Sequence, residues 1–78
     1  MNLAIVYSNR SQECERAVCL LQSLEHHYVE YILGRDFTEA QFTAEFGKEA
    51  PYPQVAIGLK HIGSLKETLQ HFNYKGKL

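Results

Sequence analysis

The chain lacks an excess of charge of either sign, and it is poor in cysteine. Its 78 residues include 8 lysines and arginines against 9 aspartates and glutamates, so the formal net charge is −1. Surfaces that bind nucleic acid or anionic membranes need a basic excess, and we therefore expect neither partner. The two cysteines are too few for the framework of several disulfides that holds small secreted domains together.

Long hydrophobic runs are also absent. No stretch approaches the roughly 18 apolar residues of a membrane-spanning helix. The apolar start, residues 1–7, lacks a charged region and is too short for a signal peptide, so we expect a cytoplasmic protein with reduced thiols. The composition, 45% hydrophobic and 22% charged, is typical of a globular protein. We expect one domain, residues 1–78, acting as a monomer.

The pattern of apolar and turn-forming residues predicts seven elements. Short apolar, β-branched runs predict strands over residues 3–7, 28–33, 53–57 and 60–62. Apolar residues at helical spacing predict helices that begin at Ser11, Thr38 and Ser64. The last two helices begin with the pattern of a capping box, Thr or Ser followed three residues later by Gln or Glu. The order β-α-β-α-β-β-α predicts an α/β fold with a mixed four-stranded sheet and helices on both faces.

Cys14 is the first residue with potential chemistry. It lies in the first turn of a helix directly after a strand, where the positive end of the helix favours a thiolate. The alternative is a half-buried packing residue, and position alone leaves both open. Ser11 is predicted to cap this helix by accepting a hydrogen bond from the amide of Cys14. Cys19 follows in the apolar stripe and is predicted to be a core residue.

Two prolines flank Tyr52 directly before the third predicted strand, and the Tyr52–Pro53 bond is a candidate cis peptide. Together with the first helix, this segment resembles glutaredoxins. In that family a strand ending in Tyr-Ser or Tyr-Thr leads to C-x-x-C and x-R-A, later followed by T-V-P-Q and H-I-G-G. The matching segments here are Tyr7-Ser8, Ser11-Gln12-Glu13-Cys14, Arg16-Ala17, Tyr52-Pro53-Gln54-Val55 and His61-Ile62-Gly63-Ser64. Length and element order are similar to the short bacterial and phage forms.

The resemblance implies the thioredoxin fold and a thiol–disulfide oxidoreductase of cell redox homeostasis. Glutathione would be the co-substrate and protein disulfides the partners. Ser11 and Cys14 would occupy the two catalytic positions, with Ser11 replacing the nucleophilic cysteine. The resemblance also implies a set of glutathione-binding positions: Arg10, Tyr52, Pro53, Gly63 and Ser64.

Ser11 removes the usual dithiol cycle, because a hydroxyl cannot form a disulfide with Cys14. An active chain would therefore use Cys14 as a single thiol. Lys66 stands where the family often has an Asp that binds the glutathione amino group, and a cation there repels an ammonium. The alternative function is a non-catalytic binding module that takes an extended peptide in the groove beside Pro53. The histidines and cysteines show no zinc spacing, so we expect no bound metal or other cofactor.

Overall fold

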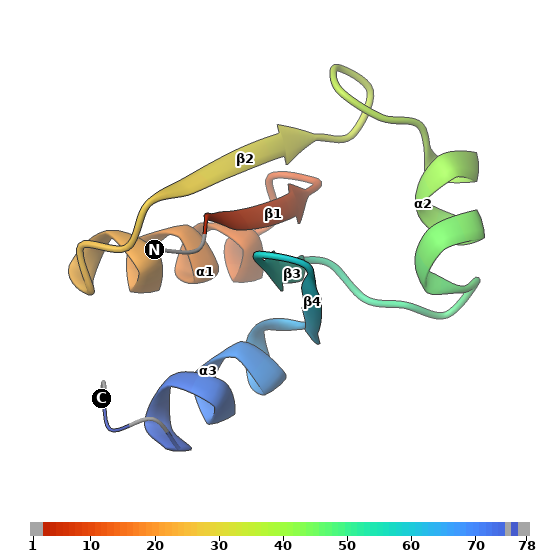
Figure 1. Cartoon of the computed structure of the whole chain (residues 1–78). Helices are drawn as coiled ribbons and strands as arrows, with labels where there is room; N and C mark the ends of the chain where they lie inside the picture. Colours follow the sequence, from red (N-terminus) through yellow and green to blue (C-terminus); the bar gives the residue numbers. More distant parts are fainter. Residues whose placement is uncertain (1–2, 75, 77–78) are drawn as a thin grey trace.

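The computed structural model describes residues 3–74 and residue 76. Over these residues the order is β-α-β-α-β-β-α, as predicted (Figure 1). The elements are β1 (Ala4–Ser8), α1 (Gln12–Ser23), β2 (Tyr28–Ile32), α2 (Glu39–Phe46), β3 (Gln54–Ile57), β4 (Lys60–Gly63) and α3 (Leu65–Tyr74). The predicted α/β class is confirmed, and the arrangement is thioredoxin-like.

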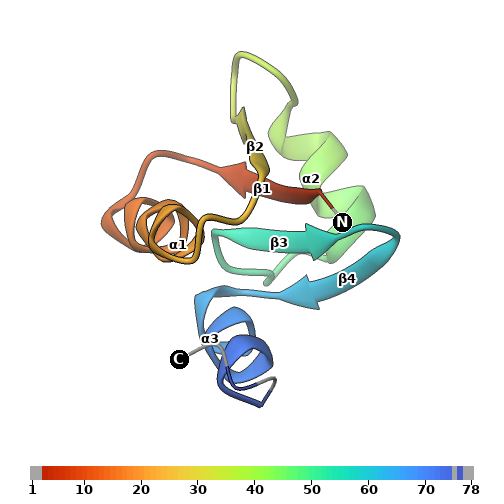
Figure 2. The same cartoon turned by 60° about the vertical axis from the view of Figure 1, so that its left-hand side comes forward.

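The four strands form one mixed sheet in the order β2-β1-β3-β4. β1 and β2 are parallel, as a β-α-β crossover requires, and β3 is antiparallel to both β1 and β4. Helices cover both faces: α1 and α3 lie on one face and α2 on the other (Figure 1, Figure 2). None of the helices in the described part of the chain has the length and apolar character needed to cross a membrane.

Alternation along β1 divides its side chains between the two faces. Ala4 and Val6 are fully buried against α1 and α3, whereas Tyr7 points to the other face and contacts Phe46 of α2. The main core lies between the sheet and the helices α1 and α3. Its buried members are Ala4, Val6, Leu21, Val55 and Phe72.

One packing prediction is wrong, because Cys19 is exposed. The buried positions of α1 are Cys14, Ala17 and Leu21, which follow the spacing of a single helical stripe. Cys19 lies five residues after Cys14, about 140° around the helix at 3.6 residues per turn. Its side chain therefore faces solvent.

The capping boxes differ in completeness. At α2 both bonds are present: the Gln41 amide donates to Thr38 Oγ1 at 3.1 Å, and the Thr38 amide donates to Gln41 Oε1 at 2.8 Å. At α3 the Ser64 amide donates to Glu67 Oε1 at 2.9 Å, and the Ser64 hydroxyl donates to the same oxygen. The side chain of Glu67 thus holds the start of α3.

Candidate functional site

The strand register brings the predicted site residues to one edge of the sheet. Tyr7 pairs with Gln54, so the end of β1 lies beside the start of β3. Val55 pairs with Gly63, which places the end of β4 at the same edge. The first turns of α1 and α3 follow β1 and β4 there (Figure 2). Three segments far apart in the sequence, residues 10–14, 52–53 and 63–64, therefore share this edge.

Cys14 lies at this edge with none of its surface exposed. Its thiol donates a hydrogen bond to Asn9 Oδ1 at 3.3 Å, and its sulfur accepts one from Ser11 Oγ at 3.3 Å. Both cysteines are free thiols. Because the sulfur is fully buried, a substrate reaches it only after the residues around it have moved.

Ser11 is the N-cap residue of α1 by its backbone, with φ −72° and ψ 169°, and its carbonyl accepts the first helical bond from the Glu15 amide. The predicted side-chain cap is wrong. The Ser11 hydroxyl makes no hydrogen bond to a helix amide and instead donates one to the sulfur of Cys14. The Ser11 hydroxyl therefore interacts directly with the Cys14 sulfur, although it cannot form a disulfide with it.

Asn9 is a site residue that the sequence motifs did not single out. Its Oδ1 accepts hydrogen bonds from the Ser11 amide at 3.1 Å and from the Cys14 thiol. The following residue, Arg10, has a left-handed backbone (φ 63°), and its amide donates to Ser8 Oγ at 3.0 Å. An Asn two residues before a helix start is typical of an Asx turn, and this was the signal that could have found it. The contact of Asn9 with the Cys14 thiol depends on the conformation of the loop at residues 9–11.

The side chain of Arg10 lines a hollow of about 240 Å³ beside β2. The other lining residues carry charges of both signs or are apolar: Glu15, Glu30, Ile32 and Arg35. Because two carboxylates share this hollow with the two guanidinium groups, it offers no clear excess of positive charge to an anion.

Tyr52 and Pro53 form a cis peptide bond, and Pro53 is buried at the start of β3. The ring of Tyr52 stacks on Phe42 with 4.1 Å between centroids. Its hydroxyl is buried and has no hydrogen-bond partner among the described residues. Burial raises the pKa of Tyr52, and the nearby Glu39 and Cys14 raise it further.

Gly63 and Ser64 lie where β4 turns into α3. Gly63 is buried with φ +131°, a conformation that favours glycine. The N-terminal end of α3, which the resemblance assigns to a glutathione carboxylate, is occupied by the carboxylate of Glu67. The hydrogen bonds from Ser64 hold the pKa of Glu67 below its ordinary value, despite slight desolvation. The neighbouring Lys66 is exposed.

Side chains that could hold a metal ion do not gather in the described part of the chain. Within residues 3–74 and 76, no three His, Cys, Asp or Glu side chains come together in a suitable way.

No protein-family model matches this chain, and neither does any curated protein with which it was compared. The resemblance to glutaredoxins therefore depends on the motifs and on the geometry of the site.

Proposed function

We propose that this chain is a glutaredoxin-like protein that exchanges thiols and disulfides with glutathione through Cys14, in the cytoplasm. One observation carries the proposal. The Cys14 thiol, the Tyr52–Pro53 segment and the Gly63–Ser64 turn share one edge of a thioredoxin-like sheet. These are the positions to which the resemblance assigns the thiol chemistry and the binding of glutathione.

The proposed cycle uses one thiol. The thiolate of Cys14 attacks the glutathione sulfur of a mixed disulfide, forming a Cys14–glutathione disulfide and releasing the substrate thiolate, which takes up a proton. A second glutathione, as its thiolate, attacks this disulfide, restores the Cys14 thiolate and leaves as oxidised glutathione. The Ser11 hydroxyl already donates to the sulfur, and a hydrogen bond to a thiolate is stronger than one to a thiol.

A second candidate is a non-catalytic module that binds an extended peptide beside Pro53. The complete burial of Cys14 favours it, because a thiol without exposed surface cannot attack a disulfide from the closed structure. The carboxylate of Glu67 at the start of α3 favours it as well, because it occupies a place that glutathione would need.

Adduct formation at Cys14 tests the redox proposal. The exposed Cys19 would also react, so the experiment uses Cys19→Ser, with Cys14→Ser/Cys19→Ser as the matched control. After incubation with oxidised glutathione in native buffer, intact mass is expected to show one glutathione on Cys19→Ser and none on the control. An adduct that forms only in denaturant would overturn the redox proposal and favour the binding module.

A reductase assay then tests whether activity is limited by the fold as a whole or by the serine at position 11. The substrate is a small mixed disulfide of glutathione, and the assay compares Cys19→Ser with Ser11→Cys/Cys19→Ser. We expect slow turnover in the first and faster turnover in the second, because the second restores the dithiol pair. Activity in the second alone would mean that the scaffold is competent and the natural chain is not. Activity in neither would favour the binding module.

A further inference from the structure

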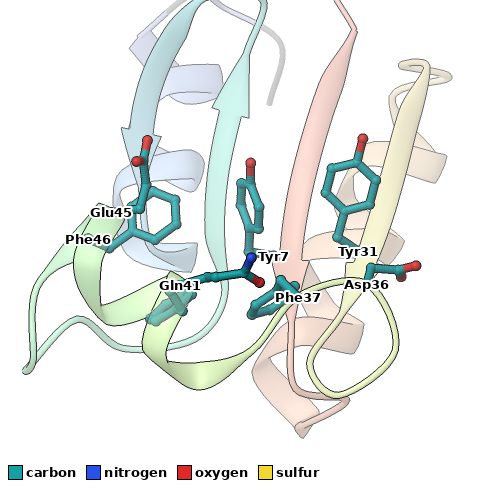
Figure 3. A pocket seen from close by; sticks show the side chains of 8 residues that line it. Tyr7, Tyr31, Asp36, Phe37, Gln41, Glu45 and Phe46 are labelled. Atoms are coloured by element: carbon teal, nitrogen blue, oxygen red, sulfur yellow. The ribbon is translucent and has the colours of Figure 1, made fainter.

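A cavity of about 400 Å³ lies between α2 and the sheet, on the face opposite α1 and α3 (Figure 3). Five of its eight lining residues are aromatic, and none is a cation. The aromatic residues are Tyr7, Tyr31, Phe37, Phe42 and Phe46, and the others are Asp36, Gln41 and Glu45. This volume falls within the roughly 300–1,000 Å³ of small-molecule sites.

Tyr7 is the ring that joins the walls of the cavity. Its centroid lies 5.7 Å from that of Tyr31, 5.5 Å from that of Phe37 and 5.1 Å from that of Phe46. The planes cross at 61°, 79° and 61°, so the rings stand at steep angles to Tyr7. A small molecule in the cavity would therefore contact more than one ring.

Two of the three polar lining residues are already engaged. Asp36 forms an ion pair with Arg35 at 2.9 Å and accepts a hydrogen bond from the Ile32 amide at 2.8 Å. Gln41 accepts the capping bond from Thr38. One oxygen of each side chain therefore already has partners within the chain.

Glu45 differs from these two, because no ion pair or hydrogen bond joins its carboxylate to another described residue. Its charge acts on Tyr7, whose pKa is raised by burial, by Tyr31 and by Glu45. Figure 3 shows the Glu45 carboxylate and the hydroxyls of Tyr7 and Tyr31 at the same side of the cavity. An unneutralised carboxylate and several aromatic rings therefore border one space.

We propose that this cavity binds a small organic ammonium ion, held by the faces of Tyr7, Tyr31 and Phe46 and by the carboxylate of Glu45. Aromatic faces attract cations within about 6 Å of the ring centroid, and recognition of quaternary ammonium groups is the best-known use of such walls. The negative potential of Glu45 adds to that of the rings, and no lining cation opposes it. The site is separate from Cys14 and does not depend on the redox proposal.

A pair of isosteric ligands tests the role of charge. Choline chloride and its uncharged analogue 3,3-dimethylbutan-1-ol have nearly the same shape, and each is titrated into the whole chain while amide and side-chain NMR shifts are recorded. We expect saturable shifts of Tyr7, Tyr31 and Phe46 with choline, and affinity at least tenfold weaker for the alcohol. Equal affinities would overturn the proposal in favour of a purely apolar cavity. No saturable choline binding, or choline shifts confined to other residues, would overturn it as well.

Matched variants test the residues. Glu45→Gln is expected to weaken choline binding about threefold or more, because it keeps the shape and removes the charge. Glu49→Gln removes an exposed charge that does not line the cavity, and it should leave the affinity unchanged. Tyr31→Leu removes one π face from a side chain that is 37% exposed, so folding should tolerate the change while affinity falls at least threefold. Equal affinities for Glu45→Gln and Glu49→Gln would overturn the role of Glu45.

Discussion

Replacing Gly63 by alanine tests how the β4–α3 turn is built. A Cβ at Gly63 would lie 2.8 Å from Glu67 Cβ, 2.9 Å from Glu67 Cγ and 3.0 Å from Glu67 Oε1. Real Cβ atoms essentially never approach others below 3.0 Å, so the first turn of α3 must shift. The backbone at this position also has φ +131°, where an L side chain is strained.

The two effects add. Strain from the positive φ costs about 1–2 kcal/mol, and forcing an extra carbon into a packed site costs about 1–3 kcal/mol. We therefore expect Gly63→Ala to lose about 2–5 kcal/mol, against a total stability of roughly 4–12 kcal/mol for a domain of this size. At about 4–8 °C per kcal/mol, the Tm would fall by at least about 8 °C.

Gly34→Ala is the matched control. Gly34 has φ +87°, but no atom lies within 4 Å of the place that its Cβ would take, so only the strain of about 1–2 kcal/mol remains. Urea unfolding followed by circular dichroism gives both losses in the free energy of unfolding. If Gly63→Ala lost no more than Gly34→Ala, the close contact with Glu67 would not exist in solution and the reasoning would be refuted.

Other contacts lead to three further predictions. Because the pKa of Glu67 is lowered in the folded state, its ionised form stabilises the fold at pH values above 4.5, the ordinary pKa, and this contribution is lost as the pH falls through the folded-state pKa. Glu67→Gln should therefore reduce the fall of the urea midpoint at acid pH. Thr38→Ala should cost about 1 kcal/mol, measured by urea unfolding, and more than Ser11→Ala, since only Thr38 makes a side-chain cap bond. A thiol reagent in native buffer should label Cys19 quickly and Cys14 only slowly, as measured by peptide mass. In the Cys19→Ser background, Asn9→Ala should speed the labelling of Cys14. An unchanged rate would mean that Asn9 does not protect the thiol.

The order of the elements could be predicted because each has a local signal. The run at residues 3–7 predicts a buried strand, and the observed β1 differs from it by one residue at each end. The Thr38–Gln41 pattern predicts a capping box, and both bonds are present. Cys19 shows the limit of such reasoning, since its apolar character suggested the core while helical geometry directs it to solvent.

The contacts of the site could be predicted less well, because they depend on side-chain orientation in loops. The Cys14 thiol bonds to Asn9 across a loop in which Arg10 has a left-handed backbone, and no residue type in that loop requires this conformation. The capping-box pattern predicted that Glu67 accepts the Ser64 amide, but not that the Ser64 hydroxyl would also donate to the same carboxylate. The aromatic cavity was not predicted, because it depends on how α2 is spaced from the sheet.

Two features of the chain oppose a glutathione-linked reaction: the Glu67 carboxylate occupies the start of α3, and the Cys14 thiol is buried. The two obstacles are not equally hard to remove. The Glu67 carboxylate is exposed, so water can replace its bonds when another carboxylate takes the Ser64 amide. The Cys14 thiol is fully buried and bonded to Asn9 and Ser11, so exposing it requires a local opening as well as the loss of these bonds. For the proposed exchange at Cys14, the free energy of that opening is therefore a larger obstacle than the occupied end of α3.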